Sequence, residues 1–200
     1  MSARNDDVKA MAEEAIADDK KLNEIIETLS VGARRDRQIA ASTVHAIAKE
    51  DPSKLMPHID VLIDALNRPE GQTRWETLEA LTLLVDIDAR ACSKAMQEAE
   101  TALFDEDNGM VRLAAMRYLC KIGATTANRS EKVWPLIDEG IQCYHGDLEF
   151  NDMLIAIVDF SNGKLAPSVK EELAERMAFD STNGKGTLKK RALQIIENLK

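Results

Sequence analysis

The sequence has 200 residues, of which 44% are hydrophobic and 30% charged, and its formal net charge is −9 at pH 7. A chain of this length forms one domain or two small ones, and it buries roughly 70% of the surface that its unfolded form exposes. It therefore needs neither disulfides nor metals to fold. The negative charge argues against broad nucleic-acid binding, which usually needs a basic face.

The sequence also lacks the patterns of a membrane span or a metal site. It has no run of 18 apolar residues and no secretory signal, so we expect a cytoplasmic protein without a membrane span. Its three cysteines form no CxxC pair, whereas a structural zinc site needs four closely spaced ligands. We therefore expect reduced, mostly buried thiols, no metal and no cofactor.

The first expected helix, residues 6–18 within an N-terminal cap segment of residues 1–20, is amphipathic. One face is made of Asp, Glu and Lys, and the other is apolar. Such a helix suits a terminal cap that shields the first repeat of a stack from water. The apolar face consists of Val8, Met11, Ala12, Ala15 and Ile16.

An apolar pattern, two hydrophobic residues followed by a third one turn later, recurs along the rest of the chain. The last residues of its copies lie 37, 37, 38 and 36 positions apart, and a second apolar landmark downstream recurs with gaps of 37, 38, 38 and 36. Segments rich in Gly, Asn, Asp and Pro separate the landmarks, so each copy is expected to be a pair of helices. The two series are Leu29, Leu66, Leu103, Ile141 and Met177, and Ile47, Leu84, Ile122, Phe160 and Ile196.

This period predicts one all-α solenoid domain over residues 1–200, with about five helical pairs after the cap and no strand. A pair of about 37 residues cannot bury its own apolar surface, but stacked pairs can. Residues 105–123 agree with this, because their apolar residues form two stripes, one for the partner helix and one for neighbouring repeats. The expected pairs are residues 21–50, 51–88, 89–127, 128–163 and 164–200.

The stretch from Asp107 to Gly123 resembles the second helix of a HEAT repeat, since Val111-Arg112 follows an Asp and small or apolar residues lead to a closing Gly. Pro57 and Pro135, in first helices, also resemble the HEAT pattern. The resemblance covers roughly residues 20–200. It implies an α-α superhelix of the HEAT/armadillo-like type, in which second helices line a concave face and mostly bind other proteins.

No catalytic motif accompanies this repeat. A Gly-rich phosphate loop, a GxSxG elbow and an HExxH pair are all missing, so we expect no catalytic residues and no enzyme activity. The most regular polar feature is an arginine near the start of three consecutive second helices: Arg37, Arg74 and Arg112. These arginines either bond to acids of the same or a neighbouring repeat or face a ligand. Suitable acids are Asp36, Glu70 and Asp107.

The charge distribution gives the best indication of function. The first-helix segments sum to −13 and the second-helix segments to +4, so the concave face implied by the resemblance is mildly basic. We interpret the protein as a non-enzymatic protein–protein interaction scaffold that binds a partner, suited to an acidic segment, on that face. Cations would pair with anions and a tryptophan would anchor apolar contacts. The expected contact residues are Arg37, Arg74, Trp75, Arg112, Arg117 and Lys121.

Two alternatives stay open. The first is a DNA-binding enzyme similar to the HEAT-like alkylpurine DNA glycosylases, in which Trp75 and Asp86 would form the base pocket; it would need a broad positive surface. The second concerns the last helix, residues 188–199, whose apolar residues either complete the core or leave an end face for a homodimer.

Overall fold

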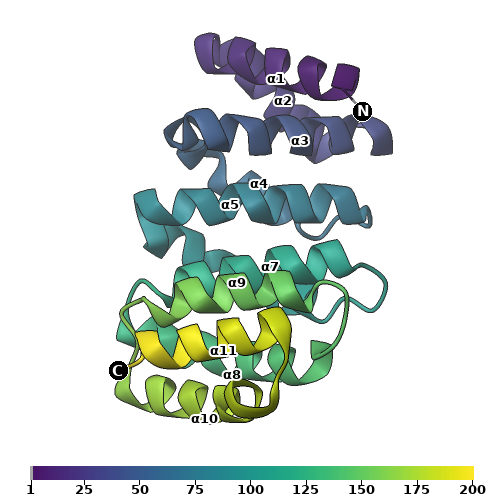
Figure 1. Cartoon of the computed structure of the whole chain (residues 1–200). Helices are drawn as coiled ribbons and strands as arrows, with labels where there is room; N and C mark the ends of the chain where they lie inside the picture. Colours follow the sequence, from purple (N-terminus) through teal and green to yellow (C-terminus); the bar gives the residue numbers. More distant parts are fainter. Residues whose placement is uncertain (1) are drawn as a thin grey trace. The chain divides into compact units, whose positions relative to one another are not determined.

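The computed structural model describes residues 2–200, with side chains from residue 6 onward. These residues form eleven α-helices and two short 3-10 helices, and no strand occurs among them (Figure 1). The predicted all-α class is therefore confirmed. In chain order the elements are α1 (Ser2–Ala17), α2 (Asp19–Val31), α3 (Arg34–Glu50), η1 (Pro52–His58), α4 (Ile59–Ala65), α5 (Gly71–Cys92), η2 (Ser93–Ala95), α6 (Met96–Leu103), α7 (Gly109–Gly123), α8 (Ala127–Tyr144), α9 (Phe150–Ser161), α10 (Pro167–Asn183) and α11 (Gly186–Asn198).

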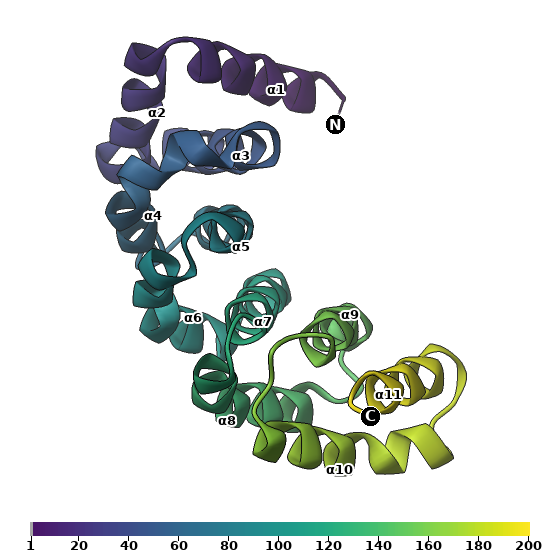
Figure 2. The same cartoon turned by 90° about the vertical axis from the view of Figure 1, so that its left-hand side faces the viewer.

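The chain divides into two compact units, one that ends at Ala102 and one that spans Leu103–Lys200. In the first unit α3 packs against both α2 and α5, while α2 also contacts α4 and α4 contacts α5. Figure 2 accordingly shows α2 and α4 as one layer and α3 and α5 as another. Helix α1 packs against α2 and α3 at the amino end of this unit, which is the position expected of the cap.

The second unit repeats the two-layer arrangement. Helices α7, α9 and α11 contact one another in sequence, and α8 and α10 cover one side of them (Figure 2). We call α3 and α5 in the first unit, and α7, α9 and α11 in the second, the second-helix layer of each unit. The helices that cover them, α2 and α4 or α8 and α10, form the first-helix layer.

Helix α7 explains the two apolar stripes of residues 105–123. It packs against α8, the first helix of the next pair, and also against α9, the next second helix of its unit. Both stripes are consequently buried, and only Met110 among the apolar residues of α7 is exposed. Nine of the ten landmark residues of the repeat are likewise buried, and the tenth, Ile196 on α11, is partly exposed.

The element boundaries differ from the sequence expectation in several places, two of which have a clear local cause. The first helix of the second pair is broken into η1 and α4, because Pro57 lies inside η1 and has no N–H to donate to an α-helical ladder. Helix α8 begins at Ala127, one residue before the expected pair of residues 128–163, because Thr126 caps it by accepting a hydrogen bond from the Arg129 N–H at 3.2 Å.

One glycine allows a close backbone contact in the second unit. The Lys164 N–H, just after α9, donates to the Ala124 carbonyl oxygen at 2.8 Å, which draws the ends of α7 and α9 together. A Cβ atom on Gly163 would lie 2.6 Å from Ala124 Cα, so only glycine fits there without a backbone shift.

The three cysteines are free and differ in exposure. Cys92 and Cys120 are buried, whereas Cys143 near the end of α8 is exposed. Burial raises the pKa of the Cys92 thiol to about 11, with the nearby Asp88 charge adding to the effect, and it raises the pKa of Cys120 further. Among residues 2–200 no helix is both long and apolar enough to traverse a lipid bilayer.

Candidate functional site

The six expected contact residues all lie on second helices. Arg37 is on α3, and Arg74 and Trp75 are in the first turns of α5. Arg112, Arg117 and Lys121 follow one another along α7 and are partly exposed. The set therefore divides into one group in each unit, and the surroundings of each group decide what it can bind.

Arg37 is held inside the first unit by a carboxylate and a backbone carbonyl. Its Nε donates to Glu70 Oε2 at 3.3 Å, its second terminal nitrogen contacts the other carboxylate oxygen, and Nη1 donates to the Gly32 carbonyl at 2.8 Å. Glu70 is the N-cap residue of α5, and its side chain is only 3% exposed. The guanidinium thus joins the turn before α3 to the amino end of α5.

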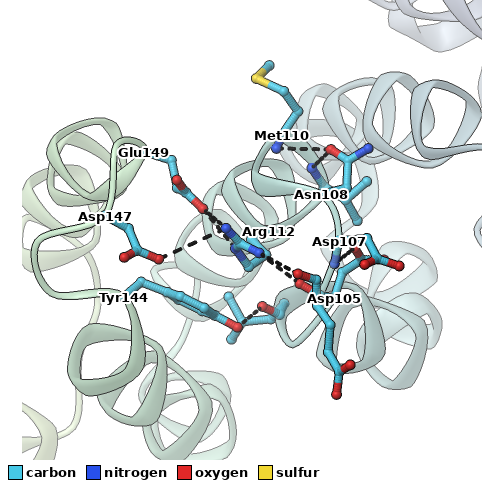
Figure 3. A network of polar contacts seen from close by, with 11 residues as sticks. Asp105, Asp107, Asn108, Met110, Arg112, Tyr144, Asp147 and Glu149 are labelled. Atoms are coloured by element: carbon cyan, nitrogen blue, oxygen red, sulfur yellow. Dashed lines mark hydrogen bonds and ion pairs between the residues drawn. The ribbon is translucent and has the colours of Figure 1, made fainter.

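Arg112 repeats this arrangement in the second unit (Figure 3). Its Nε donates to Glu149 Oε1 at 2.7 Å, and Nη1 donates to the Asp105 carbonyl at 3.0 Å. Glu149 is the N-cap residue of α9. The guanidinium also lies 5.0 Å from the ring centre of Tyr144, whose hydroxyl donates to the Leu103 carbonyl at 2.8 Å.

We call each of these arrangements an arginine–glutamate link: an arginine in the first turn of one second helix that bonds to the preceding turn and to the glutamate at the start of the next second helix. The glutamate lies where the free N–H groups of a helix favour negative charge. Burial alone would raise the pKa of Glu70, but the hydrogen bond and charge of Arg37 outweigh it, so that this pKa is lowered.

The links bear directly on the expected contact set. The guanidinium groups of Arg37 and Arg112 are already engaged by carboxylates of their own units, and 18% and 15% of these side chains are exposed. They would have to leave these partners in order to pair with a ligand. Their contact role stays a prediction, and Glu149 rather than Asp107 is the main acidic partner of Arg112.

The residues at the amino end of α7 accommodate the arginine–glutamate link between Arg112 and Glu149. Asn108 caps the helix by accepting hydrogen bonds from the Met110 and Val111 N–H groups, at 3.1 and 3.3 Å. A Cβ on Gly109 would come within 2.8 Å of Glu149 Oε1, so the glycine leaves room for the carboxylate beside Arg112. In Figure 3 the Met110 side chain points away from this network.

A second polar network, which the sequence did not reveal, joins α3 to α5 in the first unit. His45 Nδ1 lies 2.5 Å from Glu76 Oε2, and the Ser42 hydroxyl donates to Glu76 Oε1 at 3.2 Å. The Gln72 amide in turn donates to the Ser42 hydroxyl at 3.1 Å. Burial would raise the pKa of Glu76, but the hydrogen bond and charge of His45 lower it overall. This network connects α3 to α5 in addition to the arginine–glutamate link between Arg37 and Glu70.

Exposed apolar side chains mark the second-helix layer of the second unit. Met110 of α7, Ile155 of α9 and Leu193 of α11 are each close to half exposed, and Leu148 just before α9 is fully exposed. As exposed apolar side chains on three neighbouring helices, the three helix residues are candidates for contact with another molecule. None of them belongs to the expected set.

The pocket that the DNA-binding alternative requires is not assembled by α5. Trp75 and Asp86 lie on the same helix, eleven residues apart, which corresponds to roughly 16 Å along the axis at 1.5 Å per residue. No group of three or more His, Cys, Asp or Glu residues in the described part of the chain could hold a metal ion. The polar groups described above connect helices to one another.

Comparisons with known proteins place this geometry in a structural class. No family model matches the sequence, and no curated protein matches it. A designed armadillo repeat protein in complex with peptide (KR)4 is similar in structure, with a TM-score of 0.79 and 14% identity, over 98% of this chain and 91% of that chain. An engineered protein gives a TM-score of 0.77 with 15% identity over 98% and 89%.

A third structure, described as that of computationally designed armadillo repeat proteins for modular peptide recognition, matches with a TM-score of 0.72 and 13% identity. It covers 96% of this chain and 91% of that chain. Identities this low establish a common architecture only. Together with the paired, layered helices, they show that the chain has the helical-repeat fold of the armadillo/HEAT-like type.

Proposed function

We propose that the protein is a non-enzymatic scaffold that binds a segment of a partner protein on its second-helix layer. The fold supports this, because stacked helical repeats offer long surfaces that suit extended partners. Two of the similar structures point the same way by their descriptions, one in complex with peptide (KR)4 and one designed for modular peptide recognition.

The observation that carries the proposal is the set of exposed apolar side chains on the second-helix layer of the second unit. Met110, Ile155 and Leu193 come from three consecutive second helices. Protein-binding surfaces use such apolar contacts at their centre and polar groups around them. The arginine–glutamate link between α7 and α9 would keep these two helices, and so their exposed side chains, in a fixed relative position.

We further propose that the bound segment is acidic. Helix α7 carries three basic residues and no acidic one, and α3 carries four basic residues against two acidic ones. Arg34, Arg35 and Lys49 of α3 are exposed. In this arrangement the link arginine of each unit, Arg37 or Arg112, holds its helices together, and the other basic residues of α3 or of α7 attract a ligand to the second-helix layer of their own unit.

The test compares two variants on opposite layers. Ile155→Glu combined with Leu193→Glu places charge in the proposed apolar contact, while Val31→Glu changes an apolar residue of α2 that is even more exposed. We expect the double variant to lose partner capture from cell extract while Val31→Glu keeps it, with both melting temperatures close to that of the parent. Capture retained by the double variant would refute the assignment of this surface.

Peptide chemistry is tested separately with immobilised acidic, basic and uncharged peptides of equal length. Preference for the acidic peptides supports the proposed ligand class, and preference for the basic ones overturns it. Random duplex DNA serves as a further arm, because binding at low salt that weakens steeply with added salt would favour the DNA-binding alternative.

A further inference from the structure

We propose that a groove between α8 and α10, on the first-helix layer of the second unit, binds an arginine side chain of a partner protein. The groove has a volume of about 470 Å³. It lies apart from the second-helix layer, so it would provide a second contact surface. The residues that line it are Trp134, Asp138, Glu172, Glu175, Arg176 and Phe179.

An exposed aromatic ring is the first feature that calls for a ligand. Phe179 is 72% exposed, although it lies on a helix whose opposite face is buried. It follows Glu175 by four residues and Glu172 by seven, which puts all three on one face of α10. Trp134 forms the buried side of the groove, and its Nε1–H donates to Glu172 Oε2 at 2.5 Å.

The charges of the groove are not balanced by its own residues. Arg176 donates from Nε to Asp138 Oδ1 at 2.5 Å and from a terminal nitrogen to Oδ2 at 3.0 Å, so these two charges compensate each other. Glu172 and Glu175 remain, and neither has a basic partner within the groove. The space beside Phe179 therefore carries the charge of two carboxylates.

Arginine suits this combination better than other side chains. Its planar guanidinium stacks on aromatic rings, pairs with carboxylates through two parallel hydrogen bonds, and is less strongly hydrated than an ammonium group. The Arg176–Asp138 pair already shows a guanidinium in the groove with this geometry. An acidic side chain would be repelled, and an uncharged one would leave Glu172 and Glu175 without a counter-ion.

The Trp134 indole gives a direct measurement of binding. In the isotope-labelled full chain its N–H resonance, assigned with a Trp75→Phe variant, reports on the hydrogen bond to Glu172. The probes are three short peptides that differ only in carrying two arginines, two lysines or two glutamates. We expect the arginine peptide to shift this resonance saturably, with at least five-fold higher affinity than the lysine peptide and no response to the glutamate peptide.

Three variants test the residues. Phe179→Ala and Glu175→Gln should each lower the affinity for the arginine peptide by about five-fold or more. Glu171 is an exposed acid of α10 outside the groove, so Glu171→Gln should change this affinity by less than about two-fold. Since the three side chains are exposed, the melting temperatures should stay close to that of the parent. Equal binding of the lysine peptide, an unchanged affinity in Phe179→Ala, or a loss in Glu171→Gln as large as in Glu175→Gln would each overturn the proposal.

Discussion

Arg112 and Glu149 hold opposite charges in a site that water hardly reaches, since 15% and 12% of their side chains are exposed. Removing one partner of such a pair leaves an uncompensated charge and costs about 3–5 kcal/mol, whereas replacing both by apolar groups is often nearly neutral. We therefore expect Arg112→Met to lower the free energy of unfolding by about 3 kcal/mol or more. The Arg112→Met/Glu149→Met double variant should recover most of the loss in urea denaturation.

An exposed ion pair of the first unit supplies the control. Lys94 and Asp60 lie 3.0 Å apart, but 59% and 78% of their side chains are exposed. Exposed pairs are worth about 0–1 kcal/mol, so Lys94→Met should change the free energy of unfolding by less than 1 kcal/mol. If the double variant loses as much free energy of unfolding as Arg112→Met and Glu149→Met lose when their separate losses are added, the two residues act independently.

The carboxyl groups of Glu70 and Glu76 make stability depend on acid pH. Their pKa values are lowered from an ordinary 4.5, because their bonds to Arg37 and His45 outweigh the effect of burial. A group whose pKa is lower in the folded than in the unfolded chain stabilises the fold above its unfolded pKa, and this stabilisation is lost as pH falls through its folded pKa.

Glu76→Gln tests this dependence. At pH 7 the variant should be less stable than the parent, and the difference should shrink as the pH falls below about 4.5, where the parent carboxyl also becomes protonated. Free energies of unfolding from pH 7 to pH 3 measure it. A difference that stays constant over this range would assign the loss to packing and not to charge.

At the scale of helices, the packing of α7 depends on the large buried side chain of Leu119 and on the lack of a side chain at Gly163, which lies against Ala124. Leu119 is fully buried, and its replacement by Ala should cost about 2–5 kcal/mol through a cavity. Gly163→Ala should cost about 1–3 kcal/mol, because the new methyl group would press on the Ala124 backbone. Leu148→Ala, at a fully exposed position, is the control, and thermal melts that rank it beside Leu119→Ala would contradict the helix placement.

The sequence predicts the helices better than their connections. Apolar periodicity determines the order and length of the pairs, because each pair must bury the same two stripes. It does not determine which acid reaches each arginine: Glu149 is 37 residues beyond Arg112, on the next second helix, whereas Asp107 is the nearer candidate in sequence. Ile155 was missed because it is an apolar residue on a helix face whose other exposed members, Asn151, Asp152 and Asp159, are polar.

At the scale of the whole chain, polar contacts between helices join residues that lie about one repeat length apart in the sequence. His45 and Glu76 are 31 residues apart, Arg112 and Glu149 are 37 apart, and Arg191 hydrogen-bonds to Asn151 across 40. Stability in such a chain is approximately a sum of repeat and nearest-neighbour contributions. Substitutions in one link should therefore act mainly on the two helices that it joins.

Because one of the three cysteines is exposed and two are buried, we expect the folded protein to react through a single thiol. Alkylation proceeds through the thiolate, and Cys92 and Cys120 are both buried with raised pKa values, whereas Cys143 is open to solvent. We expect maleimide at pH 7 to add one mass increment to the native protein and three after denaturation, as measured by intact-mass spectrometry. A second increment under native conditions would mean that one of the buried sites opens. A single increment provides a unique attachment point for a dye or spin label on α8, without any engineered cysteine.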